Sequence, residues 1–222
     1  MPEKRSVRNL VVTYADGRFA AGGKRLAYSC RRLGQPIVCY GEGDGFTSHG
    51  DFPYYFKVDA LLAASRLAEL LIWADASVLA TGDGPLTPIF EHIGREGYWL
   101  QNNGCTNAEW CSDASLADFG FARDEAGGQC QVDAACYGIA PGHPTGRLIL
   151  DELVGHRELF RGSRNNDRQT ESRDSRCLGH RHDQSVLSLI AAKYHLDTPW
   201  PDAHMWYRWG RNPGYLLNLD HV

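Results

Sequence analysis

Residues 54–79 read YYFKVDALLAASRLAELLIWADASVL. The first half, residues 54–67, is rich in Ala and Leu and predicts a helix. Residues 70–73 (LLIW) follow almost directly and have the length and apolar character of a buried strand. A polar turn with Asp75 and Ser77 comes next. A helix that leads into a buried strand is typical of an α/β domain.

The same alternation of apolar runs and helix-period stretches extends in both directions along the chain. Strands are predicted at residues 10–14, 36–40, 70–73, 98–101 and 129–139. Helices are predicted at residues 23–33, 54–67, 88–95, 145–160 and 184–194. Because no internal repeat or linker interrupts the pattern, we expect a single α/β domain over residues 1–222.

The composition argues against several classes of protein. The formal net charge of −4 argues against a nucleic-acid partner, because phosphate binding needs a surplus of Lys and Arg. No apolar run reaches the ~20 residues that span a bilayer, so no transmembrane segment is expected. The apolar part of the N-terminal stretch is too short for the core of a signal peptide. We therefore expect a soluble, cytoplasmic protein.

The seven cysteines contain no CxxC pair. An odd number without a signal peptide argues against a disulfide framework. Cys105 and Cys111, like Cys130 and Cys136, are separated by five residues, whereas structural zinc sites prefer two to four. We expect buried thiols that pack as small apolar side chains, with a structural zinc site as the alternative.

Polar residues follow two predicted strands and precede the last helix. Thr13, Tyr14 and Asp16 follow the first strand, Asp75 follows the strand at 70–73, and HRHDQ at 180–184 precedes the helix. Ligands of α/β domains bind at the carboxyl ends of strands. A carboxylate there suits a hard divalent cation, which in turn neutralises a diphosphate.

Two of these acidic residues also have a purely structural interpretation. Asp75 can hydrogen-bond its own turn. Asp183 is a good N-cap for the helix that follows it. The residues alone leave both interpretations open beside the functional ones.

A polar loop is predicted at residues 161–181. It is either a solvated surface loop or a flap whose guanidinium groups bind phosphate oxygens. Its arginines are Arg161, Arg164, Arg168, Arg173, Arg176 and Arg181.

Taken together, these segments resemble the nucleotide-sugar glycosyltransferases of GT-A fold. In that family a helix carrying a Lys leads into a strand that ends W-x-D-x-D, the DxD motif, as residues 54–79 do up to Asp75. Residues 182–194 (HDQSVLSLIAAKY) resemble the segment in which an acid–amide pair opens a helix beside the sugar. Residues 131–139 (QVDAACYGI) resemble the strand that lines donor and acceptor. The motifs cover roughly residues 10–194 in the same order.

The resemblance implies a single-domain, GT-A-like α/β sandwich with a mixed central sheet. It implies a glycosyltransferase that moves a sugar from a nucleoside-diphosphate sugar, with a UDP-sugar favoured, to a hydroxyl of a glycan or another acceptor. Thr13, Tyr14 and Asp16 would hold the base and ribose of the donor. Lys57 would point at a ribose or phosphate, or alternatively face solvent.

The resemblance also implies a metal site. Asp75 would bind Mn²⁺ or Mg²⁺ through the diphosphate. The second aspartate of the motif is Ser77 here, and a hydroxyl is a poorer ligand than a carboxylate. A histidine such as His182 would then complete the site, or basic side chains would replace the metal.

For catalysis, the resemblance implies that Asp133 meets the sugar hydroxyls. Asp183 and its neighbour Gln184 would lie at the anomeric carbon. In an inverting enzyme Asp183 would be the general base. In a retaining enzyme the pair would stabilise an oxocarbenium-like transition state.

Two other functions stay open. His180, His182 and Asp183 resemble part of a metal-hydrolase motif in which a metal activates water. Because the DxD motif is incomplete, the chain could also be a non-catalytic module that binds a nucleotide sugar.

Overall fold

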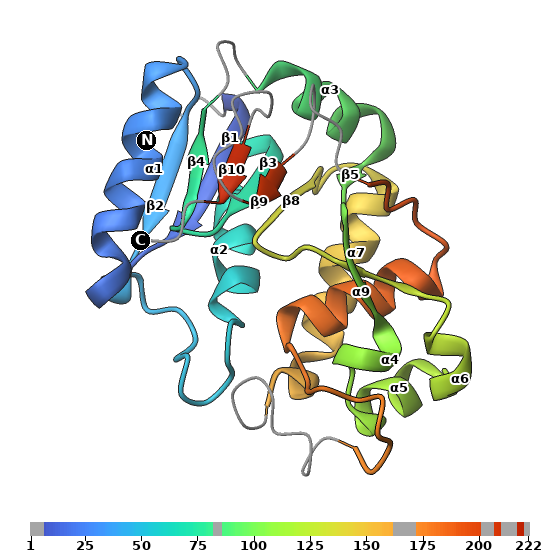
Figure 1. Ribbon diagram of the computed structural model, residues 1–222. Helices are drawn as coiled ribbons and strands as arrows, with labels where there is room; N and C mark the ends of the chain where they lie inside the picture. The colour runs from blue at the N-terminus through green and yellow to red at the C-terminus, as the bar shows by residue number, and fades with distance from the viewer. Residues whose placement is uncertain (1–6, 82–85, 162–171, 201–206, 210–216, 220–222) are drawn as a thin grey trace.

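The computed structural model describes residues 7–81, 86–161, 172–200, 207–209 and 217–219 (Figure 1). Its strands are β1 (Val7–Tyr14), β2 (Ile37–Tyr40), β3 (Ala68–Ala74), β4 (Val78–Ala80), β5 (Tyr98–Trp99), β6 (Asn102–Thr106), β7 (Cys130–Val132), β8 (Cys136–Ile139), β9 (Tyr207–Trp209) and β10 (Leu217–Leu219). Its α-helices are α1 (Ala20–Arg32), α2 (Phe56–Ala64), α3 (Thr87–Glu96), α4 (Asn107–Trp110), α5 (Asp113–Phe119), α6 (Arg123–Ala126), α7 (Pro144–Gly155) and α9 (Asp183–Lys193). Short 3₁₀ helices are η1 (Gly17–Phe19), η2 (Glu42–Asp44) and η3 (Arg157–Phe160).

The main sheet is mixed. Its strands lie in the order β2-β1-β3-β8-β5, with β1 parallel to β2 and β3, and β8 antiparallel to β3 and β5. Parallel neighbours need a crossover, and α1 and α2 supply the crossovers among β1, β2 and β3. The predicted α/β class with a mixed central sheet is therefore confirmed.

Successive side chains of β1 and β3 face opposite sides of this sheet. Leu71 and Trp73 pack with residues of α2, α7 and α9 in one apolar cluster. Leu70 and Ile72 pack with residues of α1 and α3 in another. Helices thus cover both faces, and β3 runs between two apolar layers. This explains why residues 70–73 form a continuous apolar run.

A group of short elements lies between β5 and β8. Strands β6 and β7 pair antiparallel, and helices α4, α5 and α6 gather at the lower right of Figure 1. Helix α9 packs against β7, α4 and α5. The three short helices were not predicted, because each is too short to show a helical period.

Three sequence predictions are corrected here. The strand predicted at 129–139 is broken, because Asp133 turns the chain by accepting the Ala135 N–H at 3.0 Å. The helix predicted at 145–160 ends at Gly155, and residues 157–160 form η3. Only residues 98–99 of the strand predicted at 98–101 belong to the main sheet.

A smaller sheet lies beside the turn that contains Asp75 and Ser77. Strand β4 begins directly after Ser77 and pairs antiparallel with β10, which is parallel to β9. Val78 is in register with Leu219. The backbone of residues 217–219 therefore borders the strand that leaves this turn.

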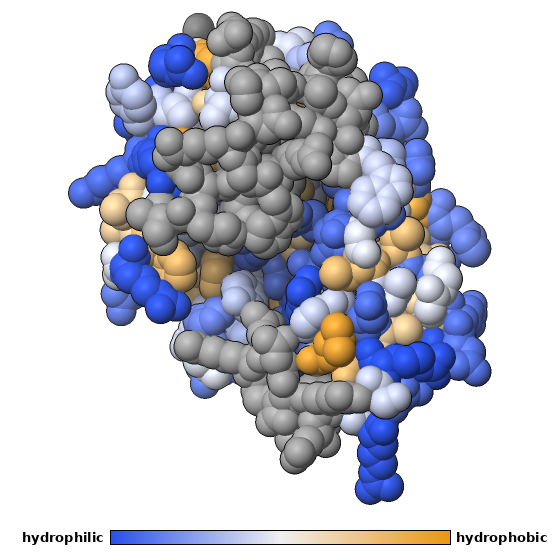
Figure 2. Space-filling model, in the orientation of Figure 1, coloured by the Kyte–Doolittle hydropathy of each residue, from blue (hydrophilic) through white to orange (hydrophobic). Residues whose placement is uncertain are grey.

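The visible surface is largely polar at one edge. Figure 2 shows hydrophilic side chains along the right-hand edge, where Figure 1 places α3 and α6.

Within the described ranges, no helix is long and apolar enough to cross a membrane. The single domain over residues 1–222 stays a prediction.

Candidate active site

Lys57 lies in the first turn of α2 and points into the protein. It shares a helix face with Leu61 and Ala64, one and two turns later, and both of these are buried. The Lys57 side chain is only 3% exposed. The alternative that Lys57 faces solvent is therefore wrong.

Three oxygens surround the Lys57 ammonium. Its Nζ donates to the carbonyl oxygen of Ala134 at 3.0 Å, and lies 2.9 Å from Asp75 Oδ1 and 2.8 Å from Asp183 Oδ2. Burial lowers the pKa of Lys57, but the carboxylates of Asp183 and Asp75 outweigh it and hold that pKa above its usual value. The ammonium thus makes one hydrogen bond and two ion pairs with the protein. Direct donation from Lys57 to a ribose or phosphate would require breaking one of these contacts.

Asp75 reaches this point because it continues the alternation of β3. It follows Leu71 and Trp73 on the α2 side of the sheet. The Trp73 indole N–H donates to Asp75 Oδ1 at 2.7 Å, and the Asp75 N–H donates to the carbonyl of Ala135 at 2.8 Å. The side chain remains 31% exposed. Asp75 is thus fixed by the core yet open on one side, and Ser77, partly buried, follows it in the turn.

Asp183 is the first residue of α9, and the N-cap is His182. The N-cap therefore lies one residue earlier than the interpretation of Asp183 as N-cap placed it. His182 has a φ of 43°, which turns the chain sharply into the helix. Burial raises the pKa of Asp183 to about 6, and the charge of Lys57 works against that rise. This carboxyl is therefore only moderately acidic.

The other two predicted catalytic residues have structural partners. Asp133 is buried in the turn between β7 and β8, and its Oδ1 accepts the Ala135 N–H. Gln184 donates from Nε2 to Gln131 Oε1 at 2.7 Å. The turn of Asp133 still belongs to the site, because the carbonyls of Ala134 and Ala135 bind Lys57 and Asp75.

The residues predicted to hold a base and ribose divide between the two faces of the sheet. Tyr14 faces α2, where its ring lies 4.5 Å from that of Phe56. Its hydroxyl donates to Asp16 Oδ2 at 3.0 Å, and burial together with Asp16 raises the pKa of Tyr14 to about 12. Thr13 is completely buried, so the structure does not support the prediction that its side chain contacts the base or ribose. Because β1 and β3 are parallel, Tyr14 and Asp16 lie at the same sheet edge as Asp75.

Further aromatic side chains, to which the sequence motifs assign no role, extend the surface around Tyr14. Phe46 lies 6.4 Å from Tyr14 and 5.0 Å from Tyr40, measured between ring centroids. Tyr54 lies 6.3 Å from Phe56, and the Lys57 ammonium is 5.3 Å from the centroid of the Tyr54 ring. The density of aromatics at residues 52–56 (FPYYF) was the available signal.

Helix α1 approaches this edge closely through two glycines. A Cβ on Gly22 would lie 2.5 Å from the carbonyl oxygen of Ala76, and one on Gly23 would lie 2.4 Å from the Ala15 Cβ. Only glycine fits at such a contact. The start of α1 is therefore packed directly against the turns that follow β1 and β3.

His180 is held by the core. Its Nδ1 accepts the Ser112 N–H at 3.3 Å, so Nε2 carries the proton and donates to the Leu159 carbonyl at 2.8 Å. Burial lowers its pKa to about 4, which keeps the ring neutral. Both ring nitrogens of His180 therefore bind the protein backbone. This leaves neither of them available as the metal ligand that the hydrolase alternative requires.

The donor set does not fit a resident divalent cation. Asp75 Oδ1 is shared by Trp73 and Lys57, and Ser77 offers a hydroxyl. The predicted ligand His182 is fully buried, with its ring 6.1 Å from that of Tyr54 and 5.3 Å from that of His180. In the part of the chain that the structure describes, no group of three or more His, Cys, Asp or Glu side chains could hold a metal ion.

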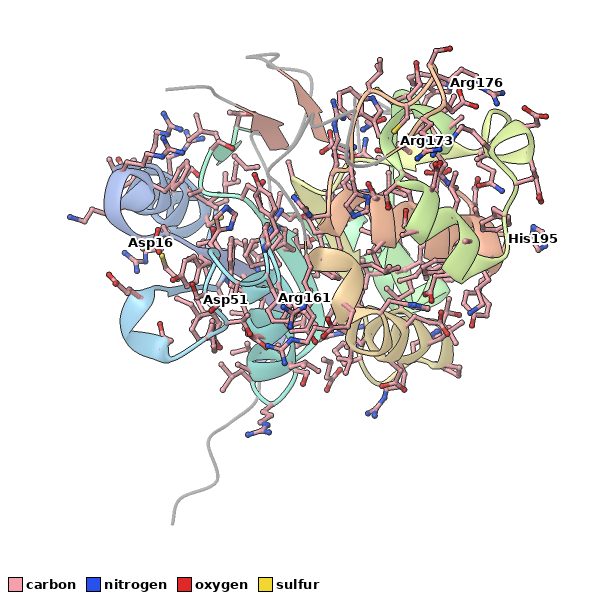
Figure 3. All side chains as sticks on the ribbon, turned by 90° about the horizontal axis from the view of Figure 1, so that it is seen from below. Asp16, Asp51, Arg161, Arg173, Arg176 and His195 are labelled. Carbon is pink, nitrogen blue, oxygen red and sulfur yellow. The ribbon has the colours of Figure 1, made fainter. Side chains whose placement is uncertain are left out.

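The described arginines of the 161–181 loop are spread out. Figure 3 shows Arg173 and Arg176 at the opposite side of the view from Asp16. Arg176 pairs with Asp124 and Asp174, both at 2.7 Å. Arg181 covers the Trp110 ring at 3.6 Å from its centroid. These contacts are those of a surface segment, and Arg164 and Arg168 lie outside the described residues.

All seven cysteines are free thiols. As predicted for thiols that pack as apolar side chains, several are buried: Cys30, Cys111, Cys136 and Cys177. Cys39 and Cys130 are exposed and Cys105 is intermediate. The exposed thiols are the exceptions to that prediction.

No known family model matches the sequence, and no curated protein matches it. Among solved structures, the chain is similar to a glycosyltransferase involved in the glycosylation of the major capsid of PBCV-1. The two chains are 10% identical, with a TM-score of 0.44 over 79% of this chain and 82% of that chain. At this level neither a fold family nor a function transfers, so the side chains of the site remain the basis for a function.

Proposed function

We propose that the chain is a glycosyltransferase of GT-A fold that moves a sugar from a nucleoside-diphosphate sugar to an acceptor hydroxyl, such as that of a glycan. The observation that carries this proposal is the convergence of the Asp75 and Asp183 carboxylates on Lys57. They meet where the parallel strands end, which is the ligand-binding edge of an α/β sheet.

Asp183 is the proposed general base. Its ionised carboxylate takes the proton of the acceptor hydroxyl. The acceptor oxygen forms a bond to the anomeric carbon while the bond from that carbon to the diphosphate breaks, and the nucleoside diphosphate leaves with the electron pair. A pKa near 6 supports this role, because such a carboxylate is ionised at neutral pH and is still basic enough to accept a proton.

The donor is proposed to lie along the edge that runs from Asp16 to Asp75. The partly buried rings of Tyr14, Tyr40 and Phe46 offer flat apolar surface for a base. Asp16 would accept from ribose hydroxyls, and the open side of Asp75 would accept from hydroxyls of the sugar. A UDP-sugar is the first donor to test.

The hydrolase alternative finds less support. Its motif needs His180 as a metal ligand, but both ring nitrogens of that residue bind the protein backbone. The burial of His180 also matches a structural role. Its neutral ring accepts one backbone N–H and donates to one backbone carbonyl, so these buried polar groups are hydrogen-bonded.

The test incubates the protein with a panel of UDP-, GDP- and dTDP-sugars and simple sugar acceptors. Turnover is measured as the release of the nucleoside diphosphate. We expect one nucleotide class to be turned over. Asp183→Asn should lower the rate by roughly 10²–10⁴-fold while donor binding stays within a few-fold. The matched control is Asp151→Asn, since Asp151 is exposed on α7 and pairs with Arg147 at 2.8 Å.

Binding of one donor without turnover in the presence of any acceptor would favour a non-catalytic module. Failure of the folded protein to bind any of these donors contradicts the proposal. The anomeric configuration of the product, read by NMR, then separates the base role of Asp183 in an inverting reaction from stabilisation of an oxocarbenium in a retaining one.

A further inference from the structure

The Lys57 ammonium lies where the two candidate carboxylates meet. Its three contacts, to Asp75 at 2.9 Å, Asp183 at 2.8 Å and the Ala134 carbonyl at 3.0 Å, come from three separate segments of the chain. The side chains of Lys57 and Asp183 are 3% and 11% exposed. The positive charge is therefore built into the site and cannot turn to solvent without losing all three contacts.

A divalent cation between these carboxylates would compete with that ammonium. Asp183 Oδ2 faces Lys57, and Asp75 Oδ1 is shared by Lys57 and the Trp73 indole. Positive charges a few ångströms apart repel strongly where water is largely excluded. One oxygen of each carboxylate is thus already paired with a cation of the protein itself.

We propose that Lys57 is the resident cation of this site, in place of the divalent metal ion that the Asp75 motif predicts. Lys57 is a positioning residue, because its ammonium lies within 3.0 Å of three protein oxygens. It holds Asp75 and Asp183 together in the wild-type protein without a bound metal ion. The catalytic meaning of this arrangement rests on the proposed function, whereas the occupancy of the site does not.

The inference predicts that removing the ammonium creates a metal site. Lys57→Met keeps most of the side-chain volume but leaves two carboxylates facing each other without a positive charge. Oxygen ligands of this kind suit a hard dication such as Mn²⁺. The variant should therefore gain an affinity for Mn²⁺ that the wild type does not have.

The experiment uses the full chain and Mn²⁺ alone. Free Mn²⁺ is followed by electron paramagnetic resonance, and unfolding temperature is measured across the same titration. We expect no site-specific binding to wild type. Lys57→Met should bind Mn²⁺ at least about tenfold more tightly than any weak, non-specific binding of Mn²⁺ to wild type. Its unfolding temperature should rise with the Mn²⁺ concentration, as linkage requires.

Two further variants make the result specific. Lys193→Met removes the exposed partner of Glu152, which lies 2.9 Å from Lys193 Nζ, and should behave as wild type toward Mn²⁺. Lys57→Met combined with Asp183→Asn removes one carboxylate and should lose the Mn²⁺ response. If Lys57→Met folds only with Mn²⁺, while this double variant folds without it, the proposal is supported.

Tight Mn²⁺ binding to wild type that disappears in Asp75→Asn would overturn the proposal. So would a folded Lys57→Met protein that ignores Mn²⁺. Donor turnover is measured in parallel with EDTA, and turnover that persists supports Lys57 as the resident cation, whereas turnover that needs added Mn²⁺ contradicts it. A complete lack of turnover counts against the proposed function only, because the Mn²⁺ titrations decide the inference by themselves.

Discussion

The indole N–H of Trp73 donates a 2.7 Å hydrogen bond to Oδ1 of Asp75. The two residues are two positions apart at the end of β3, so they project from the same face of the sheet. Trp73 is buried in the apolar cluster beneath α2. A core side chain thus orients a carboxylate that is open to solvent, and packing is transmitted directly to the candidate site.

Trp73→Phe is expected to uncouple this pair. The substitution removes the hydrogen bond, which contributes about 1 kcal/mol, and leaves a small cavity, so we expect a loss of roughly 2–3 kcal/mol in unfolding free energy. Donor binding should also weaken, because Asp75 loses one of its two side-chain partners. Urea unfolding and donor titration measure the two effects.

The control for this variant is Trp99→Phe. Trp99 is equally buried but belongs to the cluster on the other face of the sheet, with α3. Trp99→Phe should lower the unfolding free energy by a similar amount and leave donor binding unchanged. Equal losses of binding in both variants would contradict a specific role for the Trp73–Asp75 contact.

The rate of transfer is expected to depend on the ionisation of Asp183. With a pKa of about 6, raised by burial, the carboxylate becomes ionised as the pH rises through 6, so activity should increase across that range. Stability should follow the opposite course. A carboxyl whose pKa is raised in the folded state stabilises it below the unfolded pKa of 3.8, and this contribution is lost as the pH rises through 6.

Both halves of this prediction can be measured on one pair of proteins. The pH–rate profile of wild type should show an acid limb near pH 6. The unfolding free energy of Asp183→Asn, relative to wild type, should increase between pH 4 and pH 7. An acid limb that is absent, or a difference in stability that is flat with pH, would show that Asp183 does not titrate in this range.

His180 gives a separate pH dependence of stability. Burial depresses its pKa from 6.5 to about 4 in the folded protein. The neutral ring therefore stabilises the fold above pH 6.5, and this contribution, up to about 3 kcal/mol, is lost as the pH falls toward 4. His180→Gln should unfold with a shallower dependence on pH in this window. Parallel stability curves for the variant and wild type would contradict this assignment.

Gly22→Ala tests the contact between α1 and the Asp75 turn. The added methyl would lie 2.5 Å from the Ala76 carbonyl oxygen, so helix or turn must move, at about 1–3 kcal/mol. Because Ala76 separates Asp75 from Ser77, donor affinity should fall as well. Gly142→Ala is the control, since no heavy atom lies within 4 Å of its added methyl. A melting temperature unchanged in Gly22→Ala would argue against this contact.

Much of the main sheet could be predicted, because β1 and β3 are covered on both faces and read as continuous apolar runs. The short elements could not be found from period. They leave terminal signals instead, such as the capping box of Thr106 and Glu109 and the left-handed Gly120 that ends α5. The break at Asp133 was missed because Val132 before it and residues 134–139 (AACYGI) after it are largely apolar.

The candidate site was predictable in its residues but not in its arrangement. Asp75 was recognised from its place after a strand, and Asp183 from its place before a helix. The burial of Lys57 had a signal in its spacing from Leu61 and Ala64. Its partners had none, because they are brought to it by a strand turn, a broken strand and a distant helix. Spacing within one helix carries no information about such tertiary contacts.

The pairing of β4 with β10 has a consequence for how the protein is made. Val78, beside the Asp75 turn, is synthesised early, but its partner Leu219 comes much later in the chain. Until residues 217–219 leave the ribosome, this border of β4 is an open edge that can pair with other chains. The nascent chain therefore lacks this border of its candidate site for most of translation, and gains it only after residues 217–219 have left the ribosome.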